Sequence, residues 1–133
     1  MSVQWTPEID DDPVSAEVLQ WFVGAEDDSA VVGVIGEVDL STAATLGRVL
    51  QLAIDDRPPK LIVDLAQVRF LDSSGIQCLV AASRVAATVD CTLVVRNPNP
   101  SIARVFSICG VDELLMERSI AQERSDGAAP KGR

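Results

Sequence analysis

The sequence predicts an α/β domain with a mixed four- to five-stranded β-sheet, helices mainly on one face, and the order β-β-α-β-α-β-α. Short, almost continuous apolar runs at 61–65 and 92–95 are typical of strands covered on both faces. Segments with apolar residues at helical spacing alternate with these runs, which favours parallel strands joined by right-handed crossovers. Two further β-branched segments near the start of the chain predict an antiparallel hairpin at the edge of the sheet.

The hairpin and the first helix come first in the chain. Residues 18–25 and 29–37 are the expected strands of the hairpin, and the acidic stretch 26–28 is the turn between them. Ser41 is a suitable N-cap for the helix that follows, because its hydroxyl can accept a bond from a free N–H group. Apolar residues then recur at helical spacing up to position 54, and the Pro58-Pro59 pair ends the helix.

Two more helices follow the two buried strands. The first of them is expected over about 74–88, after strand 61–65. The second begins after strand 92–95, where Asn99 is the expected N-cap and Pro100 occupies the first turn. Gly110 is a C-terminal stop for this helix. Residues 114–117 fit either a last short strand or a helical turn.

The composition is that of a single folded domain. We expect an irregular acidic arm at 1–16, the domain itself at 17–118, and a disordered tail at 119–133. The net charge of −9 argues against nucleic acid and anionic membrane surfaces as partners. The start of the chain lacks a signal-peptide pattern, and no apolar run approaches the roughly 18 residues of a membrane span. The cytoplasm is therefore the expected location.

The usual catalytic and metal-binding patterns are missing from the sequence. The chain has no histidine, and its three cysteines follow no zinc-site spacing. The glycines form no nucleotide-binding motif, and the sequence around Asp72 is not the nucleophile motif of serine hydrolases. We therefore expect no cofactor, no metal and no enzymatic activity.

Two adjacent hydroxyls, Ser73 and Ser74, precede the second predicted helix. Ser74 and Gln77 have the spacing of a capping box, so the Ser74 side chain is expected to cap the helix. Ser73 would then lie just outside the helix and face solvent, as a simple turn residue or as a modification site. A phosphate on Ser73 would add about −1.5 to −2 charges. Asp72, and Asp39 if its loop lies alongside, would add to that charge, which favours a switch on binding.

Three sequence motifs together resemble one known family. They are Gly36-Glu37-Val38-Asp39, Val63-Asp64-Leu65 and Phe70-Leu71-Asp72-Ser73-Ser74-Gly75-Ile76. They are similar to the signature of STAS domains, and specifically of the bacterial anti-sigma factor antagonists, over about residues 18–117. Gln77 and Cys78 depart from the small or apolar residues that the family commonly has there. The resemblance implies the STAS fold.

The resemblance also implies a function. In this family the serine after the aspartate, here Ser73, is phosphorylated by an anti-sigma factor that is also a serine kinase of the histidine-kinase-like ATPase fold. The unphosphorylated antagonist binds the anti-sigma factor and frees a sigma factor, often in a stress response, and a serine phosphatase resets the switch. The expected partner surface comprises Asp39, Ser41, Asp72, Ser73, Ser74 and Gly75.

Three alternatives stay open at this stage. Cys78 and Cys109 would form a redox pair if their helix ends are neighbours, or all three cysteines are small buried hydrophobes. The domain would otherwise bind a small ligand or act as a scaffold in a larger signalling assembly. Both a monomer and a weak homodimer fit the sequence, because an exposed edge strand can pair.

Overall fold

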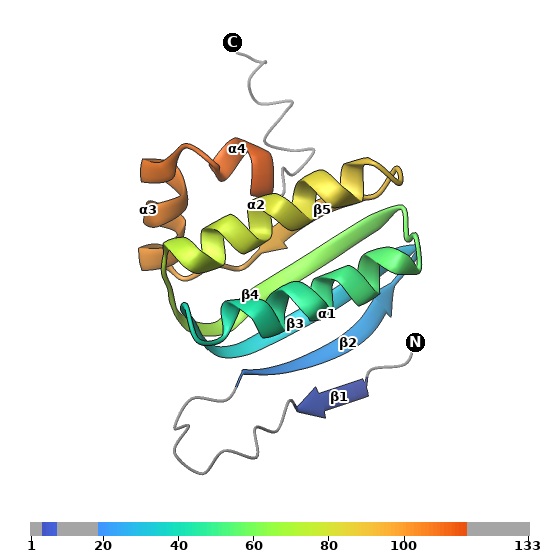
Figure 1. Cartoon of the computed structure of the whole chain (residues 1–133), viewed down its shortest axis with the longest axis horizontal. Coiled ribbons are helices and arrows are strands. Elements are labelled where there is room, and N and C mark those ends of the chain that lie inside the picture. The colour runs from blue at the N-terminus through green and yellow to red at the C-terminus, as the bar shows by residue number, and fades with distance from the viewer. Residues whose placement is uncertain (1–3, 8–18, 117–133) are drawn as a thin grey trace.

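The computed structural model describes residues 4–7 and 19–116, which form one five-stranded sheet with its main helices on one face (Figure 1). The strands lie in chain order: β1 (Gln4–Pro7), β2 (Gln20–Glu26), β3 (Ser29–Val38), β4 (Lys60–Leu71) and β5 (Thr92–Arg96). The helices are α1 (Ala43–Asp55), α2 (Ser73–Ala87), α3 (Pro100–Cys109) and α4 (Asp112–Leu115). None of the helices in the described ranges is long and apolar enough to cross a membrane.

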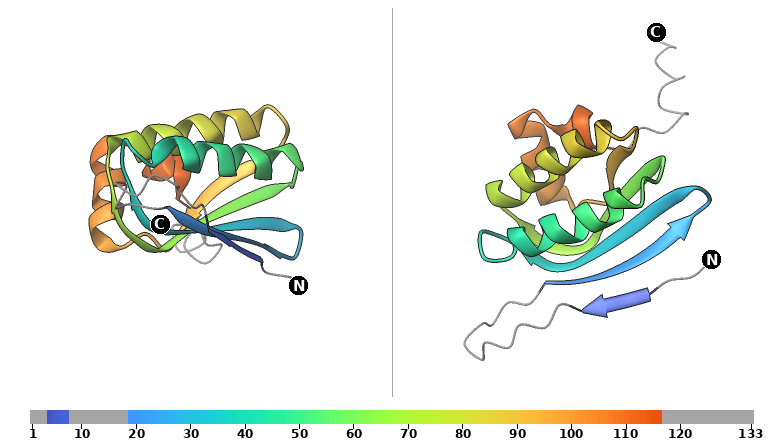
Figure 2. Two further views of the ribbon diagram at one scale, coloured as in Figure 1. Left: turned by 60° about the horizontal axis from the view of Figure 1, so that its bottom comes forward. Right: turned by 45° about the vertical axis from the view of Figure 1, so that its right-hand side comes forward.

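The topology confirms the predicted fold class. β2 and β3 form the antiparallel hairpin, and β3, β4 and β5 are parallel. The two crossovers, α1 and α2, lie side by side on the same face of the sheet, as both views in Figure 2 show. This is the arrangement expected when each strand–helix–strand unit has the same hand.

The start of the chain differs from the prediction. We expected irregular backbone over 1–16, but residues 4–7 form β1 and pair antiparallel with β2. Without β1, the outer edge of β2 would leave N–H and C=O groups unpaired. Pro7 lacks an N–H group and is tolerated because β1 is the outermost strand of the sheet. The remainder of the predicted arm and the predicted disordered tail lie outside the described residues.

β4 is much longer than the predicted strand 61–65. It continues to Leu71 because residues beyond 65 keep pairing with β3: Gln67 after a first register shift and Phe70 after a second. The apolar pattern stops at Leu65 because most residues beyond it are exposed, although they remain in the sheet. β4 therefore ends immediately before Asp72, and this single residue separates the strand from α2.

The core lies between the sheet and the helices α1 and α2. Alternate strand residues such as Val32, Val63 and Val95 face this layer and are inaccessible to solvent. The helices contribute Leu46, Leu50 and Leu79 to the same cluster. The core is almost wholly aliphatic, as the scarcity of aromatic residues predicts, with Phe106 of α3 as its one fully buried aromatic side chain among the described residues.

The elements after β5 pack around the β5 end of the sheet. Asn99 caps α3 by accepting a bond from the Ile102 N–H at 2.8 Å, and Gly110 ends it in the left-handed conformation (φ 75°). Both ends of the helix are as predicted. The two alternatives for 114–117 occur in succession, since α4 is a helical turn and Met116 then pairs with Val95 as an isolated parallel bridge.

On the face of the sheet opposite α1 and α2, side chains from different strands contact one another. The Phe22 ring lies over its cross-strand neighbour Gly33, which has no side chain to displace it. Arg96 of β5 donates two hydrogen bonds to the Glu26 carboxylate of β2, at 2.8 and 3.1 Å. Because β3 and β4 lie between those strands, the ion pair spans the middle of the sheet, and the Arg96 hydrogen bond lowers the pKa of Glu26.

We predict that Leu79→Ala lowers the free energy of unfolding by about 2–5 kcal/mol, because it leaves a cavity between α2 and the sheet. Leu79 is fully buried in the core cluster. The matched control is Leu52→Ala on α1, where the side chain is 68% exposed and the change should stay within about 0.5 kcal/mol. Urea unfolding measures both values, and equal losses in the two variants would contradict this description of the core.

Candidate functional site

The candidate site is built where β3 and β4 end. Val38 and Leu71, the last residues of the two strands, are in register, and the N–H of Asp72 donates to the Val38 carbonyl at 3.1 Å. Asp39 and Asp72 therefore leave the sheet from adjacent strands at the same edge. The predicted partner surface requires this proximity of Asp39 and Asp72, and the strand pairing provides it.

The loop that carries Asp39 is held by its own side chain. One carboxylate oxygen of Asp39 accepts the Ser41 N–H at 2.9 Å and the Ser41 hydroxyl at 2.7 Å. The hydrogen bond from the Ser41 hydroxyl is the main cause that holds the pKa of Asp39 below its ordinary value. The site therefore presents a charged carboxylate at neutral pH, on an exposed turn.

Thr42, which is not among the predicted site residues, holds the same loop from its buried side. Its hydroxyl accepts the Asp39 N–H and donates to the Glu37 carbonyl, both at 2.9 Å, and the side chain is only 4% exposed. The prediction that Ser41 caps the helix is wrong, because the cap position is Thr42 and α1 begins at Ala43. The available signal was the adjacent Ser41-Thr42 pair, in which either residue could occupy the cap.

Ser73 is the exposed first residue of α2, directly after Asp72. The Asp72 carboxylate is the N-cap and accepts the Ser74 N–H at 2.8 Å and, more weakly, the Gly75 N–H at 3.4 Å. The predicted Ser74–Gln77 capping box is therefore wrong, and α2 begins one residue earlier than expected. An aspartate caps as well as a serine, and its negative charge is also favoured at a helix N-terminus.

Gly75, which we predict to belong to the partner surface, is buried at the start of α2. A Cβ atom at this position would lie 2.8 Å from both Leu71 Cγ and Val38 Cγ1. The absence of a side chain therefore lets the first turn of α2 lie directly on the ends of β3 and β4. The role that the structure gives Gly75 is packing, which fixes the position of Ser73 next to the Asp39 loop.

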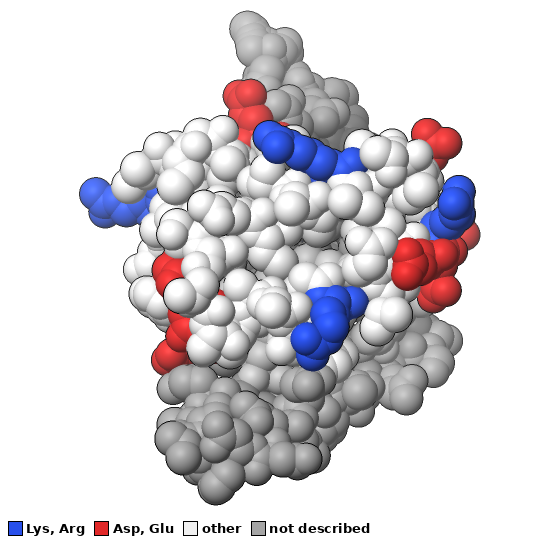
Figure 3. Space-filling view, viewed as in Figure 1, with Lys and Arg blue, Asp and Glu red and all other residues white. Residues whose placement is uncertain are grey.

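Acidic side chains lie at the end of the molecule where α1 and α2 begin, at the left in Figure 3, and a further acidic group lies at the right. Asp39 and Asp72 belong to this end by their position after β3 and β4. Of the other predicted site residues, Ser41 is exposed and Ser74 is half-buried. The geometry thus brings together two carboxylates and three hydroxyls, from Ser41, Ser73 and Ser74, on one accessible surface.

The cysteines do not form a pair in the structure. All three are free. The Cys78 thiol lies 3.6 Å from the Ala43 carbonyl of α1, and burial raises its pKa. Cys109 is exposed at the end of α3, and Cys91 is buried. The contact with Ala43 and the partial burial of Cys78 fit a packing role for this side chain.

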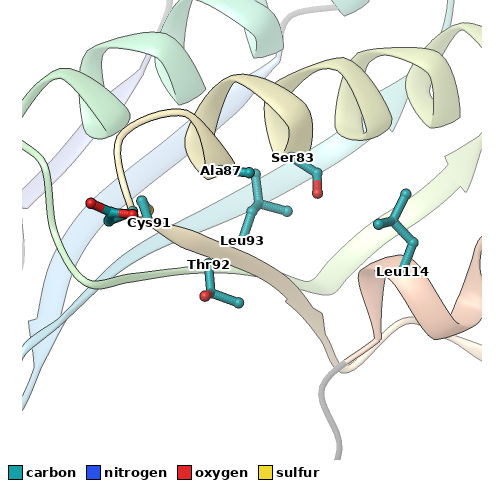
Figure 4. Close-up of a pocket in the computed structure, with 7 residues that line it drawn as sticks. Ser83, Ala87, Cys91, Thr92, Leu93 and Leu114 are labelled. Carbon is teal, nitrogen blue, oxygen red and sulfur yellow. The ribbon is translucent and has the colours of Figure 1, made fainter.

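A separate open groove of about 430 Å³ lies between the second half of α2, the start of β5 and α4 (Figure 4). Its lining includes Ser83, Cys91 and Leu114. Because β4 and β5 are parallel and Thr92 pairs with Lys60, the groove lies at the strands' amino ends, opposite the edge that carries Asp39 and Asp72. It is therefore distinct from the candidate site.

Comparison with known proteins places the fold. The model of the family described as "Mlab, STAS domain" matches residues 21–117. The anti-sigma-F factor antagonist RsfB of Mycobacterium tuberculosis is 43% identical over 54 residues, which are 41% of this chain and 44% of that protein. An anti-sigma-B factor antagonist of Staphylococcus epidermidis is 30% identical over 89 residues, or 67% of this chain and 82% of that protein. The chain thus spans less than half of the mycobacterial relative it matches.

Solved structures show the same fold. The crystal structure of an anti-sigma factor antagonist from Mycobacterium paratuberculosis superposes with a TM-score of 0.65 at 28% identity, covering 80% of this chain and 92% of that one. The anti-sigma factor antagonist SpoIIAA in its unphosphorylated form gives a TM-score of 0.61 at 21% identity, covering 81% of this chain and 95% of that one.

We predict that Thr42→Val destabilises the protein by about 1–3 kcal/mol, because valine keeps the shape but can neither accept the Asp39 N–H nor donate to the Glu37 carbonyl. Both bonds are formed by a side chain that is almost inaccessible to solvent. Urea unfolding gives the loss. Thr88→Val, at an exposed position after α2, is the control and should change stability less. A Thr42→Val variant as stable as the wild type would refute the structural role of this hydroxyl.

We predict that Ser41→Ala raises the pKa of Asp39, because it removes the hydroxyl that most favours the charged carboxylate. Because the pKa of Asp39 is lowered in the folded state, its ionised carboxylate stabilises the fold. This stabilisation is present above the unfolded-state pKa, about 3.9, and is lost as the pH falls through the folded-state pKa. Carboxyl NMR titration follows Asp39 directly. Glu26, held by Arg96, is the internal control whose titration should not move. An unchanged Asp39 titration would contradict the assignment.

Proposed function

Since the chain belongs to the STAS domain family, we propose that it is an anti-sigma factor antagonist whose binding is switched off by phosphorylation of Ser73. In this proposal the unphosphorylated protein binds an anti-sigma factor and thereby releases a sigma factor. The relatives that carry the name anti-sigma factor antagonist support the general role. The exposure of Ser73 at the start of α2, beside the Asp39 loop, is the observation that supports the switch.

Ser73 occupies an accessible position that is suitable for phosphorylation by another protein. Its side chain is exposed at the first position of the helix, so a kinase active site can reach it. The chain has no histidine that would activate the hydroxyl as a nucleophile. We therefore propose that Ser73 is a substrate for an anti-sigma factor with serine kinase activity and for a serine phosphatase, and that the protein has no catalytic site and acts in the cytoplasm.

The electrostatics of the site explain why a phosphate would block binding. Asp72 already accepts the N–H groups of Ser74 and Gly75, so these donors are not available to neutralise a phosphate on Ser73. Asp39 contributes a further negative charge from the adjacent strand end. A phosphate would add about −1.5 to −2 charges to this surface. Burying this added charge in an interface without matching counter-charges costs desolvation free energy, and a cost of about 2.7 kcal/mol weakens binding roughly a hundredfold.

We expect Ser73→Glu to weaken binding to the anti-sigma factor of the same organism at least tenfold, whereas Ser73→Ala binds like the wild type. Isothermal titration calorimetry with the purified anti-sigma factor measures both affinities. Ala81→Glu is the matched control, because it adds the same charge at an exposed position further along α2 and should leave binding unchanged.

Phosphate transfer is followed in the same system. Incubation with the anti-sigma factor and ATP should add one phosphate, located at Ser73 by mass spectrometry and absent from Ser73→Ala. Full binding by a folded Ser73→Glu variant would exclude the switch. A wild-type protein that binds no anti-sigma factor would exclude the antagonist function itself.

A further inference from the structure

We propose that Leu40 is the apolar anchor of the partner surface and enters a leucine-sized pocket, bordered by basic groups, on the anti-sigma factor. The inference rests on the function proposed above and adds a residue outside the predicted partner set. Leu40 lies between Asp39 and Ser41, in the turn that joins β3 to α1. It therefore lies within the surface that carries Ser73, and its hydrophobicity is not explained by the fold.

Leu40 is the most exposed large hydrophobic side chain among the described residues, with 83% of its surface accessible. A single exposed leucine is not unusual in itself, since much of any protein surface is apolar. The position of Leu40 is informative because the side chain makes no contribution to the core and because charged and hydroxyl groups flank it on both sides. This is the composition of an interface centre, where an apolar residue is surrounded by a polar rim.

The backbone on either side of Leu40 is fixed by hydrogen bonds. Asp39 donates its N–H to Thr42 Oγ1, and its carbonyl accepts the N–H groups of Thr42 at 3.1 Å and Ala43 at 2.8 Å. The Asp39 carboxylate holds Ser41 through both its N–H and its hydroxyl. Leu40 is therefore displayed at a defined place before any partner arrives. Preorganisation of this kind lowers the entropy cost of binding and is typical of residues that dominate affinity.

The charges around Leu40 define the kind of pocket it fits. Asp39 adjoins it, and its pKa is lowered, so it is ionised at neutral pH. Asp72 lies on the neighbouring strand end. A partner surface that contacts both carboxylates needs Lys or Arg side chains around the apolar pocket to compensate them. These basic side chains would also attract the unphosphorylated surface during encounter. If their charge compensates only Asp39 and Asp72, a phosphate on Ser73 would enter the interface without counter-charges of its own.

The test compares two leucines of similar exposure. The purified anti-sigma factor is titrated with the wild type, with Leu40→Ala and with Leu52→Ala, whose side chain is 68% exposed on α1. We expect Leu40→Ala to weaken binding about tenfold or more, as for an interface hot spot, and Leu52→Ala to stay within about twofold. Urea unfolding midpoints should be the same for the wild type and Leu40→Ala. Leu40→Met, which keeps an apolar side chain of similar volume, should retain most of the affinity.

The outcomes separate this inference from the function on which it rests. Binding by Leu40→Ala within about twofold of the wild type would overturn the anchor role, while Ser73→Glu would still report on the switch. Equal weakening by Leu40→Ala and Leu52→Ala would also overturn it, because the effect would then not be specific to the loop. A wild-type protein that binds no anti-sigma factor would overturn the proposed function and the anchor role together.

Discussion

The parallel pairing of β3 with β4 is the constraint on which the rest of the structure depends. These two strands form the middle of the sheet, and their buried aliphatic residues support both α1 and α2. The same pairing sets Val38 opposite Leu71, so the two segments that follow start from one edge. A slip of one residue would turn the inner side chains outward and would also separate Asp39 from Asp72. Core packing and site geometry therefore both depend on the pairing of these two strands.

The helix that carries Ser73 is positioned by the same residues. Val38 and Leu71 are the side chains that a Cβ at Gly75 would strike, so the lack of a side chain there allows the close approach of α2. The Asp72 cap then fixes where the helix begins. Buried contacts directly beneath Ser73 thus fix its position. Substitutions in this part of the core would therefore shift Ser73 on the surface.

The sequence predicted the larger features of the fold because they depend on local pattern. Short, almost continuous apolar runs predicted β4 and β5, and β-branched segments predicted the hairpin of β2 and β3. Asn99 and Gly110 predicted the ends of α3 through their own capping and backbone preferences. The starts of α1 and α2 were predicted less well. Ser41 and Thr42, or Asp72 and Ser74, are comparable caps by residue type, and the choice depends on where the preceding strand ends. That end depends on pairing with a neighbouring strand, as the polar second half of β4 illustrates.

The charged and hydroxyl residues of the candidate site could be predicted from the sequence, but the buried residues that hold them in place could not. Asp39, Asp72 and Ser73 are evident from motif and spacing, whereas the buried position of Thr42 is a tertiary property. The same holds for the close packing of Gly75 against Val38 and Leu71. The exposure of Leu40 likewise depends on the path of the turn, since leucine is among the residue types that are most often buried.

The hydrogen-bonded turn around Asp39 has a consequence for the timing of the proposed switch. Its backbone is already held by Thr42 and Ser41, and Ser73 is already exposed. Addition of a phosphate would then change the charge of a preformed surface, without a need for the Asp39 turn or the start of α2 to fold first. If these two segments carry the switch, the rates of the kinase and the phosphatase would set its response time in the cell.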